Sequence, residues 1–195
     1  MKVLQILPQL NIGGVERGTL DLSKALIHKG HESFVISGGG ILVDELEQFG
    51  AKHYEIPVHI KSLRTLFLAK SLSETISSID PDIVHIRSRM PAWVNYRAFK
   101  MLQKKPLLVS TFHGLYSFPI YSKVMSFVDH SIAISKTVES YILENYKLDK
   151  NDITVIPRGC DPVEFNNDEI NPDDKAEIIN EFPQIVGKTV LTIPG

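Results

Sequence analysis

Two adjacent glycines stand between the first apolar run of the sequence and its first helical segment. Asn11, Gly13 and Gly14 follow "KVLQILP", and Glu16 and Arg17 come after Val15. Glycines at the N-terminus of a helix let backbone amides approach an anion closely, which is a common way of holding phosphate. A tight turn that requires positive φ is the alternative, but a glycine pair followed by a charged pair favours a phosphate-binding function.

The spacing of these glycines argues against two common nucleotide-binding motifs. A dinucleotide fingerprint needs G-x-G-x-x-G and an acidic residue at the end of the second strand, where this chain has Ser37 to Gly40. Gly13 and Gly18 have the spacing of a P-loop, but Thr19 comes next and the phosphate-binding Lys is absent. A dehydrogenase and an NTPase are therefore both disfavoured.

Charged residues also follow the apolar run "DIVHI", the fourth along the chain. Arg87, Ser88 and Arg89 come after it and precede a helix that Pro91 can begin. Arg makes bidentate contacts with phosphate or carboxylate, so this segment can hold an anionic substrate. Pairing with nearby acidic residues is the alternative, and for Arg89 the two interpretations are equally open.

Two further strand ends carry polar residues. His113 and Gly114 follow "LLVSTF", and we expect His113 to touch substrate, although a lone His is more often a structural polar residue. Arg158 and Asp161 lie in "IPRGCD" at the end of the last run. For Asp161 a turn that leads into a linker is as good an interpretation as ligand contact.

These residues need a scaffold that brings strand ends together. Short apolar runs alternate with segments of helical period, which is typical of an α/β protein with a parallel sheet and helices on both faces. We expect a Rossmann-like, doubly wound, mostly parallel sheet of about seven strands. Because ligands bind at the carboxyl ends of such strands, the candidate residues should converge at one edge. The predicted strands are "KVLQILP", "ESFVIS", "HYEIP", "DIVHIR", "LLVSTFH", "HSIAIS" and "ITVIP".

The helices should lie between these strands. In the first, the spacing puts Val15, Thr19, Leu22, Ala25 and Leu26 on one face, and Gly30 ends it. The predicted helical ranges are 15–29, 41–49, 62–79, 91–104, 121–127 and 136–146.

Composition limits which partners and which cellular compartment are expected for the protein. The chain has 195 residues, 43% of them hydrophobic, and a net charge of -2 without a basic cluster, which argues against nucleic acid as a partner. A single cysteine, Cys160, fits a reducing compartment, and no signal peptide or long apolar run is evident, so a cytoplasmic location is expected. The basic and apolar segment "KSLRTLFLAKSL" can rest on an anionic membrane surface at the inner face, although a sheet-covering helix explains it equally simply.

The end of the chain differs in kind from the rest. We predict an N-terminal domain over residues 1–163, an acidic linker with a short helix over 164–187, and over 188–195 the first strand of a further, C-terminal domain.

Taken together, the motifs "GGVERGTLDLSKAL", "PDIVHIRSR", "STFHG", "AISKTV" and "VIPRGCD" resemble the N-terminal domain of retaining GT-B glycosyltransferases. The resemblance is to the large family 4-like group that includes many bacterial lipopolysaccharide and exopolysaccharide sugar transferases, and it runs from Met1 to Gly195. In that group two Rossmann-like domains face each other across a cleft. The N-terminal domain mainly binds the acceptor, and the C-terminal domain holds the nucleotide sugar.

The resemblance implies roles for individual residues. Gly13 and Gly14 would lie against the donor diphosphate, and His113 matches the active-site histidine near the transferred sugar. No metal or cofactor is implied, because the nucleotide sugar is itself the substrate. Acceptor contacts are expected from Glu16, Arg17, Arg87, Ser88 and Arg89. Gly114, Arg158 and Asp161 are further candidate site residues without an assigned role.

The sequence also departs from complete members of the group. They carry a basic loop and an E-x₇-E motif beyond the strand that "TVLTIPG" matches, and this chain has neither. Glu169 and Glu177 lie in the acidic linker and do not replace that motif. We therefore expect a glycosyltransferase that needs a C-terminal donor-binding domain as partner and is inactive without it. The alternative is a non-catalytic module that binds a glycan or lipid acceptor.

Overall fold

The computed structural model describes residues 1–60, 63–116, 119–159 and 171–191. Contacts divide the chain into two units, Met1–Arg158 and Gly159–Gly195. The predicted site residue Asp161 and most of the segment that joins the units lie outside the described residues. The predicted boundary between residues 163 and 164 therefore stays a prediction.

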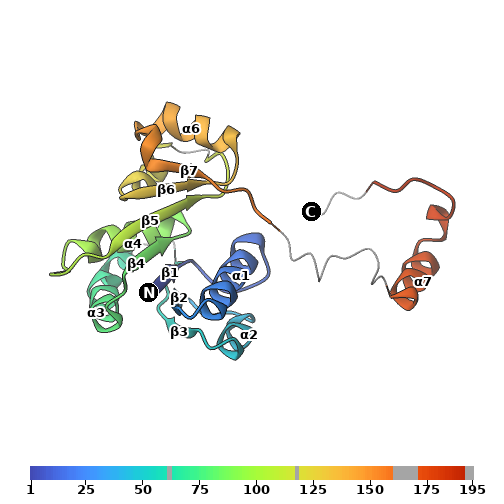
Figure 1. Ribbon diagram of the computed structural model, residues 1–195, viewed down its shortest axis with the longest axis horizontal. Coiled ribbons are helices and arrows are strands. Elements are labelled where there is room, and N and C mark those ends of the chain that lie inside the picture. Colours follow the sequence, from blue (N-terminus) through green and yellow to red (C-terminus); the bar gives the residue numbers. More distant parts are fainter. Residues whose placement is uncertain (61–62, 117–118, 160–170, 192–195) are drawn as a thin grey trace. The chain divides into compact units, whose positions relative to one another are not determined.

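The first unit is built on one parallel sheet of seven strands in the order β3-β2-β1-β4-β5-β6-β7 (Figure 1). This confirms the predicted Rossmann-like α/β fold. A strand forms at each predicted run, and six of the seven strands end earlier than the run. The strands are β1 (Lys2–Ile6), β2 (Glu32–Ser37), β3 (Lys52–Glu55), β4 (Ile83–Ile86), β5 (Leu107–Phe112), β6 (His130–Ala133) and β7 (Ile153–Val155).

The predicted helical ranges also contain helices, with two differences in kind. The range 62–79 begins as the 3₁₀ helix η1 (Leu63–Leu68) before α3, and the range 121–127 lies across the short α5 and the 3₁₀ helix η2 (Lys123–Ser126). The α-helices of the first unit are α1 (Gly14–His28), α2 (Val43–Gln48), α3 (Ala69–Ile79), α4 (Arg89–Phe99), α5 (Pro119–Ser122) and α6 (Lys136–Tyr146), and η3 covers Lys150–Asp152.

Helix α4 begins two residues before the predicted start at Pro91. Ser88 is its N-cap, so Pro91 occupies the third helical position. The missing N–H of proline costs nothing there, because the amides of the first turn have no acceptor within the helix.

The second unit contains α7 (Pro172–Glu181) and the 3₁₀ helix η5 (Pro183–Ile185). Asn171 caps α7 by accepting a hydrogen bond from the amide of Asp173. Residues 188–191 form no strand. Residues 192–195 lie outside the described part, so the predicted strand over 188–195 stays a prediction. No helix among the described residues is long and apolar enough to span a membrane.

The sheet packs against two apolar clusters on its two faces. The larger joins alternate residues of the central strands, such as Leu4, Ile6 and Phe112, to α3, α4 and α6. The smaller joins Leu7 and Leu10, just beyond β1, to Leu20 of α1 and to α2. Alternation of side chains along each strand sends successive residues to opposite faces, so both faces are covered by the same short strands.

The buried face of α1 matches the predicted one only in part. Thr19, Leu20 and Ser23 are its buried residues, whereas the predicted Ala25 is exposed. Gln5, a fully buried polar residue in the middle of β1, donates to the backbone oxygen of Thr19 and to Ser23 Oγ, so a polar side chain is tolerated at Ser23. The apolar period of the helix therefore predicted Thr19 but not Leu20 and Ser23.

The loop after β2 holds the loop after β1 in place. Leu10 donates its amide to Gly39 O at 2.8 Å and accepts from the amide of Leu42 at 2.9 Å. Gly40 lies at φ +143, and a Cβ there would overlap the backbone carbonyl of Leu10. Gly40 thus allows a close backbone approach that holds the loop before α1 in place.

We predict that Gly40→Ala destabilises the fold by about 2–4 kcal/mol, because it combines an unfavourable φ with a backbone clash. Gly30→Ala is the matched control, since Gly30 also has positive φ (+76) but open space around its Cβ position; it should cost only about 1–2 kcal/mol. Urea unfolding of the three chains measures both values, and equal losses in the two variants would contradict this account.

Candidate functional site

Four of the predicted site groups come together at the carboxyl edge of the sheet. A guanidinium nitrogen of Arg158, just after β7, donates to the backbone oxygen of Gly14, and Arg158 Nη2 lies 2.8 Å from His113 Nδ1. Arg87, just after β4, comes near the same turn of α1: a Cβ at Gly18 would be 3.2 Å from Arg87 Nη2 and 3.7 Å from Arg158 Nη1. Strands β1, β4 and β5 are neighbours, so their loops open at one place.

The twin glycines are not required by backbone conformation. Gly13 has φ 168, which is extended backbone that any residue can adopt, and neither Gly14 nor Gly18 has positive φ. The alternative of a tight turn is therefore excluded for these positions. Space is what they provide: a Cβ at Gly13 would overlap the Glu16 carboxylate, and one at Gly14 would be 3.0 Å from Arg158 Nη1.

The N-terminus of α1 is an electropositive end without a side-chain cap. Gly13 is its N-cap and offers no side-chain acceptor, so the first-turn amides lack partners within the helix. Glu16 folds back over Gly13, as its proximity to the Gly13 Cβ position indicates. A carboxylate in this place is favoured by the helix dipole, and it marks the spot as one that attracts negative charge.

Arg87 is a buried cation held by a neutral group. Its side chain is 6% exposed, and its Nη1 donates to Gln5 Oε1 at 2.8 Å. Its Nε has no hydrogen-bond partner among the described residues, and none of the ion pairs found there includes Arg87. Burial and the nearby Arg158 lower the pKa of Arg87 to about 10, although Glu16 and Asp21 act in the opposite direction.

His113 is neutral at physiological pH. Burial, together with Arg87 and Arg158, lowers its pKa to about 3. Because a guanidinium can only donate, His113 Nδ1 accepts the hydrogen bond from Arg158 and the ring proton lies on Nε2. Nε2 is buried and has no partner in the described part of the chain, so it is a free N–H donor at the site.

The loop that carries His113 is fixed from α6. Tyr141 donates its hydroxyl to Tyr116 O at 2.5 Å, and the Tyr116 hydroxyl accepts from the amide of His113 at 3.4 Å. Phe112 packs against the Tyr116 ring at 5.6 Å. Sequence reasoning missed Tyr116, and "STFHGLY" contains no signal that a tyrosine three residues later would support the histidine.

Arg89 lies over two tyrosine rings. Its guanidinium carbon is 4.8 Å from the Tyr116 ring centre and 5.6 Å from that of Tyr121. Cation–π contact holds the guanidinium flat and leaves its N–H groups at the edge free to donate. Two interpretations of Arg89 were open, and no ion pair between Arg89 and an acidic residue is seen in the described residues. Its neighbour Ser88 is the N-cap of α4, and the Ser88 side chain makes no capping hydrogen bond.

Other predicted contacts are arranged differently. Arg17 forms an ion pair with Glu45 of α2 at 2.7 Å, so it joins two helices rather than the Arg87 and Arg158 group. A Cβ at Gly114 would meet nothing within 4 Å, and no close approach there requires glycine.

Gln5 is a second residue that sequence reasoning overlooked. It is the one polar side chain in the apolar run "VLQIL", and such an interruption of a buried strand is a signal that was available. Its amide joins β1 to α1 and to Arg87.

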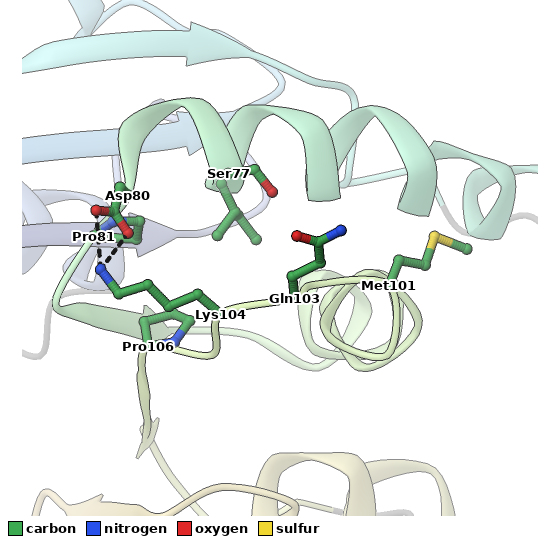
Figure 2. Close-up of a pocket in the computed structure, with 8 residues that line it drawn as sticks. Ser77, Asp80, Pro81, Met101, Gln103, Lys104 and Pro106 are labelled. Carbon is green, nitrogen blue, oxygen red and sulfur yellow. Dashed lines mark hydrogen bonds and ion pairs between the residues drawn. The ribbon is translucent and has the colours of Figure 1, made fainter.

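A cavity of about 390 Å³ lies away from this site. It is lined by residues that precede β4 and β5, with Lys104 Nζ paired to Asp80 at 2.7 Å across it (Figure 2). These residues are at the amino ends of the strands, opposite the edge where Arg87 and His113 lie. Since ligands of open α/β sheets bind at the carboxyl ends of the strands, we assign the chemistry to the edge that carries Arg87 and His113. No group of three or more His, Cys, Asp and Glu among the described residues could hold a metal ion.

Comparison with known proteins identifies the family. A sequence model described as Glycosyltransferase Family 4 matches residues 12–164, which include every group of the site described above except Gln5. The chain belongs to Glycosyltransferase Family 4. The predicted resemblance to the N-terminal half of a GT-B glycosyltransferase is thereby confirmed, and the seven-stranded parallel sheet agrees with it.

Solved structures share this fold. A glycosyltransferase from Rickettsia africae ESF-5 is 36% identical with a TM-score of 0.76, over 93% of this chain and 49% of that one. Anabaena Alr3699/HepE, solved with UDP and glucose, is 17% identical with a TM-score of 0.72, over 93% of this chain and 50% of that one, a likeness of fold alone.

A human protein is similar in sequence. It is a subunit of phosphatidylinositol N-acetylglucosaminyltransferase of Homo sapiens, 26% identical over 186 residues, which are 87% of this chain and 38% of the human protein. This Family 4 chain thus spans half or less of the length of these relatives.

The neutral state of His113 predicts a pH dependence. In the unfolded chain His113 has a pKa near 6.5, whereas in the folded chain it has a pKa of about 3. The contribution of neutral His113 to the free energy of unfolding is therefore present above pH 6.5 and is lost as the pH falls below that value. Between pH 7 and pH 5 the loss from His113 is about 2 kcal/mol.

His113→Gln should reduce the fall in unfolding free energy between pH 7 and pH 5 by that amount, as measured by urea unfolding at both values. In the parent chain the His113 ring signal should not titrate over this range in an NMR experiment. A midpoint near pH 6.5 would contradict the buried, neutral state.

Proposed function

We propose that this chain is the acceptor-side half of a retaining glycosyltransferase. The reaction moves a sugar from a nucleotide-sugar donor to a glycan or lipid-linked acceptor in the synthesis of bacterial lipopolysaccharide or another cell-surface polysaccharide. Membership of Family 4 supports sugar transfer. The name of the human relative, which refers to phosphatidylinositol, supports a lipid-linked acceptor.

The observation that carries the proposal is the twin glycines at an uncapped helix end. Their φ values do not require glycine, so what glycine supplies there is space beside the first-turn amides. A diphosphate fits that space by its charge, because the helix dipole, Arg158 and Arg87 all favour an anion there. Glu16 lies over Gly13 in this structure, and rotation of its flexible side chain would admit the ligand.

The charges suggest how the leaving group is stabilised. When the bond between the anomeric carbon and the diphosphate oxygen breaks, negative charge grows on the diphosphate. Two guanidinium groups and the end of α1 lie where they would oppose that charge, and such pre-oriented groups lower the barrier. We assign no cofactor or metal to the reaction.

His113 would act as a hydrogen-bond donor rather than as a base. Its Nε2–H is free, and Nδ1 is engaged with Arg158. A neutral imidazole of this tautomer can hold a sugar hydroxyl or ring oxygen in place. Arg89, held flat by two tyrosines, supplies donors to an anionic group of the acceptor, and Ser88 and Gly114 lie beside these groups in sequence.

The proposed partners are a C-terminal donor-binding domain, the nucleotide sugar and the acceptor. We also propose a cytoplasmic location with peripheral contact to the inner membrane face. Exposed apolar residues support that contact: Ile120 is 91% exposed and Phe67 is 79% exposed.

The direct test joins this chain to the donor-binding half of the Rickettsia africae glycosyltransferase, which is 36% identical over the shared part. We expect release of nucleoside diphosphate from one nucleotide sugar of a panel when a lipid-linked acceptor extract is present, with the anomeric configuration retained in the NMR spectrum of the product. His113→Ala in the same chimera should lower kcat by about 100-fold or more.

A chimera that binds the donor but transfers no sugar to any acceptor would contradict the proposed glycosyltransferase activity. If such a chimera still bound the acceptor with His113→Ala in place, the non-catalytic acceptor-binding module would be the correct account.

A second test uses the 195-residue chain alone. Gly13→Ala should change the unfolding free energy by less than about 1 kcal/mol, because φ 168 suits alanine and only the mobile end of Glu16 is near. It should weaken pyrophosphate binding by about tenfold in calorimetry. Gly50→Ala, at φ +90 with open space, should do the opposite: lose about 1–2 kcal/mol of stability and keep the affinity. Equal affinity in the parent chain and Gly13→Ala would contradict the diphosphate role.

A further inference from the structure

Gln5 links three elements through one buried amide. Its Nε2 donates to Thr19 O at 3.1 Å and to Ser23 Oγ at 2.9 Å, both in α1, and its Oε1 accepts from Arg87 at 2.8 Å. Ser33 of β2 donates in turn to Ser23 Oγ at 3.0 Å. Gln5 is fully buried, so no water competes for these groups.

The orientation of this amide is determined by its partners. Thr19 O is a carbonyl and can only accept, so the NH₂ of Gln5 must face α1. Its two hydrogens are then used by Thr19 and Ser23. The carbonyl oxygen is left facing Arg87, whose guanidinium can only donate. The sequence thus fixes both the direction of the Gln5 amide and the direction of Arg87.

The neutrality of Gln5 matters as much as its geometry. A carboxylate in its place would form a buried ion pair with Arg87 and cancel the charge that faces Gly18. An amide supplies one hydrogen bond and leaves the positive charge uncompensated. The acids that influence Arg87 are Glu16 and Asp21, and neither is within ion-pair distance of it in the described residues.

We propose that Gln5 is a positioning residue that aims Arg87 at the N-terminal turn of α1 while keeping its charge available for an anionic ligand. This rests on the proposed function, since it deepens the account of the diphosphate end of the site. Gln5 itself touches no ligand. It acts through Arg87, and Ser23 serves only to hold Gln5.

The test measures pyrophosphate binding by calorimetry with the 195-residue chain. Gln5→Glu should weaken binding by about tenfold to 100-fold, because Arg87 then has a carboxylate partner. Gln5→Met removes the acceptor without adding charge, and a smaller loss of about threefold to tenfold is expected from the freer Arg87.

Two controls separate positioning from a merely structural role. Ser23→Ala breaks the same buried network but leaves the Gln5 to Arg87 contact, so it should lower the melting temperature and keep the affinity within twofold of the parent chain. Gln103→Glu adds the same charge at an exposed position at the opposite edge of the sheet, and it should change neither quantity. If Gln5 were only structural, Gln5→Glu and Ser23→Ala would behave alike.

The outcomes distinguish the two proposals. If the parent chain binds no pyrophosphate, the proposed diphosphate site fails. If the parent chain binds and folded Gln5→Glu binds within twofold of it, the role of Gln5 is overturned. Should Gln5→Glu fail to fold, the Arg87 Nε–H signal of the ¹⁵N-labelled parent chain decides: it should shift as pyrophosphate saturates the chain, and an unmoved signal overturns the proposal.

Discussion

Arg87 is a charged side chain in the interior, and the contact that allows this is its hydrogen bond to the Gln5 amide. Burying a guanidinium costs free energy unless its donors find acceptors. One acceptor from β1 and the proximity of two acidic side chains offset part of that cost. The remaining positive charge faces the first turns of α1, where Gly18 leaves room for it. The electrostatics of the carboxyl edge follow from this arrangement.

The same arrangement contributes to the state of His113. Burial is the largest cause that makes protonation of the imidazole unfavourable, and the two guanidinium groups nearby add to it, so the ring stays neutral and accepts a hydrogen bond from Arg158. That bond in turn leaves Nε2–H as a donor at the site. Small residues at the start of α1, a positive charge with no carboxylate partner in the described residues and a neutral donor are the properties on which the proposed function rests.

Much of this was available from the sequence, for physical reasons. Runs such as "ESFVIS" are apolar on both faces, which is typical of a parallel strand covered by helices, and parallel strands bring the residues that follow them to one edge. That argument predicted the fold class and the neighbourhood of Gly14, Arg87, His113 and Arg158. It could not predict that Arg17 pairs with Glu45 instead of facing a ligand, because the direction of a side chain on a helix surface is not given by the period of the helix.

The errors had different causes. The apolar period of α1 pointed to Ala25, which is exposed, and missed the buried Ser23, which accepts a hydrogen bond from Gln5 of β1. Apolar patterning assumes an apolar partner surface, and here that surface carries a polar residue. Supporting residues such as Tyr116 act through loop backbone, and that contact arises only in three dimensions.

The claim that this edge binds the diphosphate of a nucleotide sugar is tested most directly by a crystal structure of the 195-residue chain grown with pyrophosphate. The account predicts the anion against the first-turn amides of α1, within hydrogen-bond distance of Arg158 and beside Arg87, with the Glu16 carboxylate turned away from Gly13. Pyrophosphate bound instead beside Lys104 at the opposite edge, with Glu16 still over Gly13, would contradict it.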